Sequence, residues 1–315
     1  MKHKYFCPAI PMMLITWICA VMANAQGLNV SSSKNAQDIQ AKIIQSVQEN
    51  VDFMKEHVVD LLSIEEVTIE EFDVKGKLTK TTDITSEYRV FSEAIKNSSD
   101  CSFAYEALES TMPAGILRDE RVILSAKENN KTQRAERFNF NEPVWSKGHN
   151  HAGYLVFFDK LYENCFYYSL NGVEKIDGRD AYGIEVMKRE EEVGESKGMS
   201  WKLAYLTTAW IDAETMDVVQ LNRNNLAVTY TYAISTADLQ KFRSMPDIRK
   251  VISYTVNAQY KYGKVKINDQ LLTLPTEKTI RFIRENGQLE TAYKYRYNDY
   301  KAFNVATKIL FGASE

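Results

Sequence analysis

Residues 252–262 read ISYTVNAQYKY, and this stretch decides the fold. Apolar or aromatic side chains at Ile252, Tyr254 and the following even positions alternate with polar ones at the odd positions. Side chains on a β-strand point to opposite faces with a period of two, so the pattern predicts one long strand with one apolar, tyrosine-rich face. Most strands run only about 5–6 residues, so this one indicates a large antiparallel sheet that is covered on one side.

Similar runs recur along most of the chain after Leu61, for example at 103–109, 217–222, 226–232 and 279–284. Neither a β-α-β rhythm nor a fixed repeat is present, which excludes a parallel sheet and a repeat architecture. The sequence therefore predicts an α+β fold. It consists of a large curved antiparallel β-sheet, a half-barrel of about 10–12 strands, wrapped around an N-terminal helix and one or two short helices.

The turns and helices of this fold also have sequence signals. Asp177-Gly178 and Asn129-Asn130 predict tight hairpin turns, because these residues tolerate positive φ. A short helix is expected at 155–162. An amphipathic helix is predicted from Asn35, its expected cap, to Val58, where it would fill the concave side of the sheet. Its apolar stripe is Ile39, Ile43, Ile44, Val47, Val51, Met54 and Val58.

The first residues have the layout of a secretory signal peptide. A basic start is followed by an apolar run from Ile10 to Met22 and by Ala23-Asn24-Ala25, so cleavage is expected after Ala25. Lipidation at Cys19 is a weaker alternative, because Thr16-Trp17-Ile18 is a poor lipobox. The expected division is residues 1–25 as signal peptide, 26–34 as a flexible leader and 35–315 as a single half-barrel domain, located in the periplasm or secreted from a bacterial envelope.

Composition excludes several classes of partner. The formal charge is −3 over the whole chain and becomes about −5 once Lys2 and Lys4 leave with the signal peptide. Nucleic acid calls for a basic patch, so no nucleic-acid partner is expected. No apolar run in the rest of the chain is long enough to span a bilayer, so no transmembrane segment is expected in the mature chain.

Two cysteines, Cys101 and Cys165, remain after the signal peptide is removed. In an exported protein they are compatible with one disulfide, and two buried thiols are the alternative. Sequence cannot place their Cα atoms within bonding distance, so both alternatives stay open.

Two short motifs resemble a catalytic and a metal site, but their surrounding sequence does not fit either one. Gly194-Glu195-Ser196-Lys197-Gly198 fits the nucleophile elbow of hydrolases, but no apolar strand leads into it. His149 and His151 would share a face on a strand, yet zinc wants at least three protein ligands. The interpretation is a solvated loop in both cases, with no catalytic residue, no metal and no cofactor.

The aromatic residues are the remaining functional signal. Phe157, Phe158, Trp210, Tyr254 and Tyr260 are the candidate lining of a ligand cavity on the concave side of the sheet. The alternative is that these rings simply form the core.

Four segments together resemble a known family. They are Ile176-Asp177-Gly178-Arg179-Asp180-Ala181-Tyr182, Ala209-Trp210-Ile211-Asp212-Ala213-Glu214-Thr215, Leu274-Pro275-Thr276 and Tyr297-Asn298-Asp299-Tyr300-Lys301-Ala302-Phe303. Their order over residues 165–305 is similar to that in the LolA/LolB-like superfamily of outer-membrane lipoprotein carriers and its uncharacterised bacterial relatives. The resemblance implies a half-barrel around helices with an apolar cavity for acyl chains. No functional residue is carried over from the family.

Three hypotheses on function follow. The first is an exported, non-enzymatic protein that binds a lipid, a lipoprotein acyl chain or another apolar ligand in the half-barrel. The second is a structural or interaction protein of the envelope with a fully packed interior. The third is a hydrolase of unknown type, which would need a nucleophile and a base within hydrogen-bond reach of one another.

Overall fold

The computed structural model describes residues 30–57, 60–92, 101, 104, 117–135, 149–189, 206–232 and 250–302. The chain forms two compact units, residues 1–42 and 43–315, each described by itself. In the first unit the described residues are the N-terminal part of helix α2 (Val30–His57). The predicted signal peptide and its cleavage site lie outside the described residues, as do residues 26–29 of the predicted leader.

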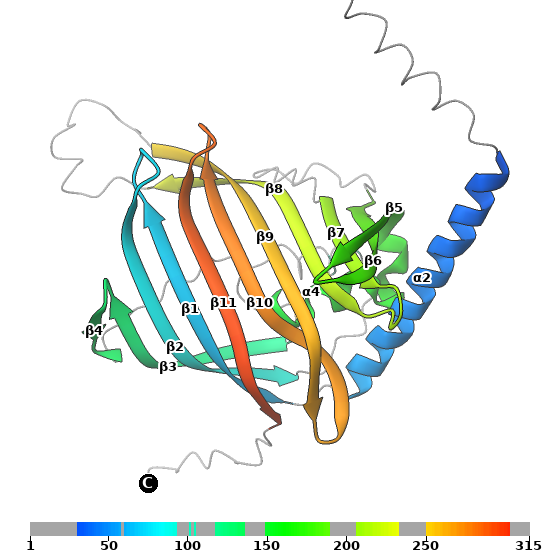
Figure 1. Ribbon diagram of the computed structural model, residues 1–315, viewed down its shortest axis with the longest axis horizontal. Coiled ribbons are helices and arrows are strands. Elements are labelled where there is room, and N and C mark those ends of the chain that lie inside the picture. The colour runs from blue at the N-terminus through cyan, green and yellow to red at the C-terminus, as the bar shows by residue number, and fades with distance from the viewer. Residues whose placement is uncertain are drawn as a thin grey trace, which may run out of the picture. The chain divides into compact units, whose positions relative to one another are not determined.

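The second unit is built on one open sheet of eleven antiparallel strands (Figure 1). Its order is β4-β3-β2-β1-β11-β10-β9-β8-β7-β6-β5, so β4 and β5 form the two edges. The strands are β1 (Leu61–Phe72), β2 (Leu78–Ser92), β3 (Leu117–Glu128), β4 (Lys131–Gln133), β5 (Phe166–Ile176), β6 (Arg179–Lys188), β7 (Leu206–Asp212), β8 (Val218–Tyr232), β9 (Lys250–Ile267), β10 (Gln270–Arg284) and β11 (Leu289–Ala302). The predicted fold class, a large antiparallel sheet with few helices, is confirmed.

One face of the sheet, here called the inner face, carries most of the core. Alternate residues of β9 are buried there, from Tyr254 to Tyr262. The pairing register continues this face across the sheet, because Ala258 lies opposite Ile280 and Ile280 opposite Tyr293. Residues of β1 and β2, such as Val67 and Ile84, extend the same buried surface. The alternation that predicted a one-sided sheet is thus present in five neighbouring strands.

Helix α2 supplies part of the cover from Ile43 onward. The side chains of Ile43, Val47, Val51 and Met54 are at most 4% exposed and belong to the same core cluster as the sheet residues. The predicted filler role of this stripe is confirmed from Ile43 to Met54, whereas Ile39 is 46% exposed and Val58 lies outside the described residues. The expected cap was wrong: α2 begins at Val30, so Asn35 lies inside the helix and does not cap it.

Helix α4 (His149–Phe158) and the 3₁₀ helix η3 (Lys160–Cys165) follow each other closely. Asp159 caps η3 by accepting a hydrogen bond from Leu161 N at 3.0 Å. The loop expected at His149 and His151 was wrong, because the chain is helical from His149. Residues two apart on a helix do not share a face, so the geometry that suggested a metal pair at His149 and His151 is lost.

Several predicted strand boundaries differ from the structure. The predicted strands 217–222 and 226–232 are one strand, β8, with a register shift between Arg223 and Leu226. β10 begins nine residues before the predicted 279–284 strand. Pro275 does not end the strand, because a register shift between Pro275 and Glu277 accommodates it. The strand expected at 103–109 lies outside the described residues except at Ala104, which is helical.

The two hairpin turns that the sequence indicated have the expected backbone. Asn129 and Asn130 have φ values of 47° and 64°, and Asp177 and Gly178 have φ values of 48° and 85°. Asn268 and Asp269, at 46° and 66°, form a third such turn between β9 and β10 that the sequence reading missed. Asn, Asp and Gly at these positions set the strand register with little strain.

A disulfide joins Cys101 to Cys165, with Cα atoms 5.3 Å apart and a sequence separation of 64. Of the two alternatives that the sequence left open, this is the one in the structure. The bond links Cys101 to the last residue of η3.

Candidate ligand-binding face

A row of side chains crosses the inner face at the level of Tyr260. In the pairing register Tyr260 lies opposite Lys278, Lys278 opposite Tyr295, and Tyr295 opposite Val67. Farther along the same face, beyond the pair Ala258 and Ile280, Tyr254 and Phe282 pack edge to face with ring centroids 5.9 Å apart. The inner face therefore has large aromatic walls that also carry polar groups.

Lys278 is buried within this row and is 1% exposed. Its Nζ atom lies 4.3 Å from the ring centroid of Tyr295 and 6.0 Å from that of Tyr260. Aromatic faces attract an ammonium group, which offsets part of the cost of taking the charge out of water. A lysine at this depth places a positive charge inside an otherwise apolar face.

Glu65 is the buried carboxylate of the same face, and its side chain is 0% exposed. Arg121 donates to it from Nη2 at 2.9 Å and from Nε, and the hydroxyl of Ser86 donates to it at 3.1 Å. The guanidinium of Arg121 also lies 4.4 Å from the ring centroid of Tyr88. Glu65 thus belongs to a hydrogen-bonded ion pair that joins β1, β2 and β3.

Tyr262 brings a buried hydroxyl group close to the row. Its side chain packs edge to face on Tyr154 of α4, with ring centroids 4.9 Å apart. Burial, and then the neighbouring Tyr260 and Tyr154, raise the pKa of Tyr262 well above its ordinary value, against the field of Arg223. The phenol is therefore protonated at neutral pH and is available as a donor. Within the described part of the chain its oxygen has no hydrogen-bond partner.

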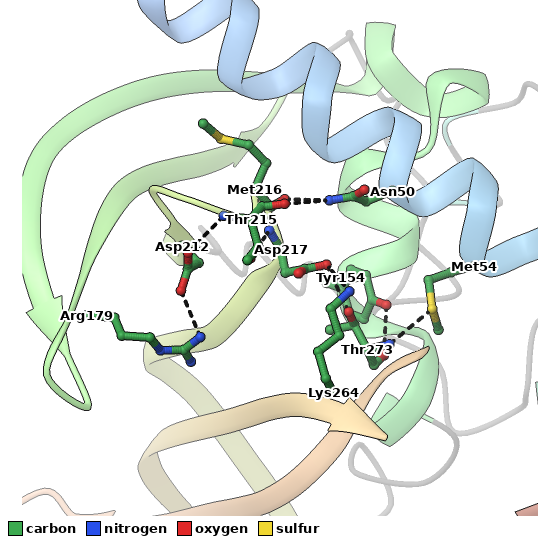
Figure 2. A network of polar contacts seen from close by, with 10 residues as sticks. All are labelled: Asn50, Met54, Tyr154, Arg179, Asp212, Thr215, Met216, Asp217, Lys264 and Thr273. Carbon is green, nitrogen blue, oxygen red and sulfur yellow. Dashed lines mark hydrogen bonds and ion pairs between the residues drawn. The ribbon is translucent and has the colours of Figure 1, made fainter. Parts of the chain in front are cut away.

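A polar network holds α2 and α4 to one end of this face (Figure 2). Asp217 accepts from Lys264 Nζ at 2.7 Å and from the Thr273 hydroxyl at 3.0 Å. The Tyr154 hydroxyl donates to the carbonyl oxygen of Thr273 at 3.0 Å, and the amide of Thr273 donates to the sulfur of Met54 at 3.2 Å. These contacts position the helices, and none of them requires a ligand.

Asn50 continues the network on the side of α2. Its side-chain amide donates to the carbonyl oxygen of Met216 at 2.9 Å, in the turn between β7 and β8. Asp212 stabilises the same turn by accepting from the amides of Glu214 and Thr215 at 2.9 and 3.0 Å, and it forms an ion pair with Arg179 at 2.8 Å. Figure 2 shows Arg179 reaching Asp212 from the side opposite Asn50.

Replacing Asp212 by asparagine tests the charge at this turn. Burial alone would raise the pKa of Asp212, but the amides of Thr215 and Glu214, together with Arg179, lower it below its ordinary value. A carboxyl whose pKa is lower in the folded state stabilises the fold above its unfolded pKa and loses this effect as the pH falls through the folded pKa. We therefore expect Asp212→Asn to lower the free energy of unfolding by about 1–2 kcal/mol at pH 7.

The readout is urea unfolding of the wild type and of Asp212→Asn, measured between pH 7 and pH 3. The difference between the two proteins should shrink as the solution becomes more acidic than about pH 4, near the ordinary pKa of aspartate. A difference that stays constant over this range would contradict the role of the charge.

The predicted cavity residues do not all share one face. Phe157, Phe158, Tyr254 and Tyr260 belong to the same core cluster on the inner face. Trp210 belongs to a separate cluster with Ala181 and Val219, while its neighbours Ala209 and Ile211 lie in the main core. Trp210 is thus on the outer face and cannot line a cavity with the other four.

Gly183 explains how Trp210 is buried there. It lies directly opposite Trp210 in the register of β6 and β7, and a Cβ atom on it would be only 2.9 Å from the indole ring. The absence of a side chain at Gly183 lets the ring lie flat on the sheet, where it is 7% exposed.

The charged residues of the inner face were missed from the sequence, although a signal was present. Lys278 is spaced by two and four residues from Ile280 and Phe282, and Glu65 by two from Val67, so each charged residue falls on the apolar face of its strand. A charged residue in the apolar register of a strand is a candidate for a functional site, because burying it is expensive.

The remaining sequence motifs give no site within the described residues. The Gly194–Gly198 motif lies outside them. In the part of the chain that the structure describes, no group of three His, Cys, Asp or Glu residues could hold a metal ion. No helix among the searched residues is long and apolar enough to cross a membrane.

No family model matches the chain, and no curated protein matches it either. Solved structures do align with it. A LolA superfamily protein from Nitrosomonas europaea has 11% identity and a TM-score of 0.35, over 84% of this chain and 97% of that one. A DUF1329 family protein from Desulfovibrio piger has 10% identity and a TM-score of 0.34, over 84% and 95%. A putative outer membrane lipoprotein-sorting protein domain from Vibrio parahaemolyticus has 9% identity and a TM-score of 0.34, over 86% of this chain and 95% of that one.

Identities near 10% concern the fold alone. The functional argument below uses only the residues of this chain.

Proposed function

We propose that this chain is an exported, non-enzymatic protein that binds a lipid, a lipoprotein acyl chain or another apolar molecule against the inner face of its sheet. The single observation that carries the proposal is the one-sidedness of the sheet. Its inner face combines large aromatic rings with buried polar groups, while the outer face of the same strands carries residues such as Asn257 and Gln259. A mostly apolar surface with a few polar groups is typical of small-molecule sites.

Export rests on two independent features. The sequence predicts a signal peptide that ends at Ala25, and the structure contains the disulfide between Cys101 and Cys165. Disulfides persist in oxidising compartments such as the bacterial periplasm and are rare in the cytosol. Both features support a location in the envelope or outside the cell.

A specific observation favours the second hypothesis, an envelope interaction protein with a packed interior. All five predicted cavity residues are buried, and Tyr254, at 9%, is the most exposed of them. Core packing alone would give the same burial. A binding experiment is needed to separate the two functions.

The experiment is the unfolding midpoint of the mature protein with and without methyl palmitate, a neutral acyl chain. A ligand that binds only the native state raises the free energy of unfolding, by about 2.7 kcal/mol at 100 times its dissociation constant. We expect the midpoint to rise with the concentration of the ester. An unchanged midpoint up to the solubility limit would contradict the proposed function and favour the packed interior.

Two tryptophan substitutions on β9 provide the matched control. Ala258 is 2% exposed in the middle of the inner face, and Gln259 is exposed on the outer face. Ala258→Trp should abolish the shift caused by methyl palmitate, because the new ring occupies the inner face. Gln259→Trp should retain the shift, and loss of it in both variants would point to binding elsewhere.

A further inference from the structure

We propose that the bound molecule is an anionic amphiphile, and that its carboxylate or phosphate head lies on the inner face beside Tyr262, Arg223 and Lys278. This inference rests on the proposed function and extends it from an apolar ligand to one with a defined charge. It adds a polar end to the ligand face that the sequence predicted at Tyr254 and Tyr260.

The first observation is the hydroxyl group of Tyr262. The residue is 5% exposed, and among the described residues its oxygen has no hydrogen-bond partner. Buried hydroxyl groups almost always have one, because leaving a donor unsatisfied away from water is costly. Two of its polar neighbours donate elsewhere: the Tyr154 hydroxyl donates to the Thr273 carbonyl, and the Tyr300 hydroxyl donates to the Pro275 carbonyl at 2.7 Å. An acceptor brought by a ligand would satisfy Tyr262.

The second observation is the sign of the charge around this hydroxyl. The buried charged side chains at inner-face positions of the described strands are Glu65, Arg223 and Lys278. The carboxylate of Asp217, in the turn before β8, is also buried near Tyr154, and it is paired with Lys264 Nζ at 2.7 Å. Glu65 is held by Arg121 and Ser86. Arg223 is 4% exposed and Lys278 is 1% exposed, and both lie on strands that flank β9.

Arg223 and Lys278 bracket the strand that carries Tyr262. Lys278 pairs with Tyr260, two residues from Tyr262 on the same face. Arg223 is close enough for its charge to influence the Tyr262 phenol. Arg223 and Lys278 both have contacts of their own. An added anion would be attracted by their positive charges and would not need a hydrogen bond from either residue.

An anionic head fits this field better than a neutral or cationic one. In a low-dielectric interior a positive field strongly favours a negative charge and opposes a second positive one. The protonated phenol of Tyr262 can donate to a carboxylate or phosphate oxygen, and a hydrogen bond to a charged acceptor is about twice as strong as a neutral one. The aromatic walls at Tyr254 and Phe282 would then contact the chain of the amphiphile.

The test compares palmitate with methyl palmitate, which has the same chain without the charge, and adds lysophosphatidate for the phosphate head. Binding is measured for the wild type, Tyr262→Phe and Lys278→Met, all as the mature protein at neutral pH. We expect the wild type to prefer palmitate over its ester by about tenfold or more. The preference should fall by a similar factor in both variants, while the affinity for the ester stays unchanged.

Tyr262→Phe is the decisive variant, because it removes only an unsatisfied oxygen and should fold like the wild type. Tyr167→Phe is its matched control: Tyr167 lies on β5, is 53% exposed, and should keep the full preference. If lysophosphatidate and palmitate both bind more tightly than methyl palmitate, the site recognises negative charge. If only one of them does, the head group is identified as a phosphate or a carboxylate.

The two proposals fail in different ways. Equal affinity of the wild type for palmitate and its ester would overturn the anionic site and leave the proposed function intact. An undiminished preference in Tyr262→Phe would place the anion elsewhere and also overturn the inference. Absence of binding by every amphiphile would overturn the proposed function itself.

Discussion

Replacing Glu65 by glutamine should lower the free energy of unfolding by about 3–5 kcal/mol, one of the two largest effects expected for this protein. The Glu65 side chain is fully buried and holds Arg121, whose side chain is only 15% exposed. Loss of the carboxylate removes the charge that Glu65 supplies to a mostly buried guanidinium. The measurement is urea unfolding followed by circular dichroism.

Two controls accompany the Glu65 variant. Glu66 is the next residue of β1 and lies exposed on the opposite face, so Glu66→Gln should change the stability by no more than about 0.5 kcal/mol. The double variant Glu65→Leu with Arg121→Met removes both charges and should be more stable than Glu65→Gln, because no buried charge is left unmatched. A Glu65→Gln protein as stable as Glu66→Gln would show that the ion pair is not buried in solution.

Removing the disulfide should have an effect of similar size. Cys101 and Cys165 have a sequence separation of 64, and closing a loop of this length raises the free energy of the unfolded chain by about 4 kcal/mol. The double variant Cys101→Ala with Cys165→Ala should unfold at a correspondingly lower urea concentration. The residue Cys165 is 1% exposed, so alanine is preferred over serine, which would bury a hydroxyl group.

A reductant provides the control for the disulfide. It should lower the stability of the wild-type mature protein toward that of the double alanine variant and leave the variant unchanged. The folded wild-type protein should have no free thiols before the reductant is added. If its urea midpoint then stays the same after reduction, the stabilising role of the bond is contradicted.

The local patterns of the sequence predicted the framework well. Period-two alternation in β9 and the stripe at Val47, Val51 and Met54 reflect burial on one side, which sequence records directly. The hairpin at Asp177-Gly178 follows from the positive φ that these residues tolerate. These features depend on neighbours within a few residues of one another.

Features that depend on distant strands were not predicted. Trp210 was grouped with the inner-face rings, since the sequence does not say which face of β7 meets the helices. The strand predicted at 279–284 begins nine residues earlier, because residues 270–275 pair with β9. The roles of Glu65 and Lys278 emerge only from the register, which brings Arg121 to one and the rings of Tyr260 and Tyr295 to the other.

The anionic-head inference also comes from the three-dimensional register. Tyr262 lies within the stretch that predicted the sheet, but its sequence neighbours do not indicate an unsatisfied hydroxyl group. The approach of Arg223 from β8 and Lys278 from β10 becomes visible only when the three strands are paired. The same strand that defines the fold therefore carries the proposed binding site.

The most direct test of the central claim is a native mass spectrum of the full-length chain expressed with its signal sequence and purified from the envelope without detergent. A protein that carries an amphiphile on its inner face should show a mass above that of the mature polypeptide, and collisional activation should release a lipid detected in negative-ion mode. The Ala258→Trp protein should lose the added mass, and Gln259→Trp should keep it. A wild-type spectrum with the mass of the bare polypeptide alone would contradict the account.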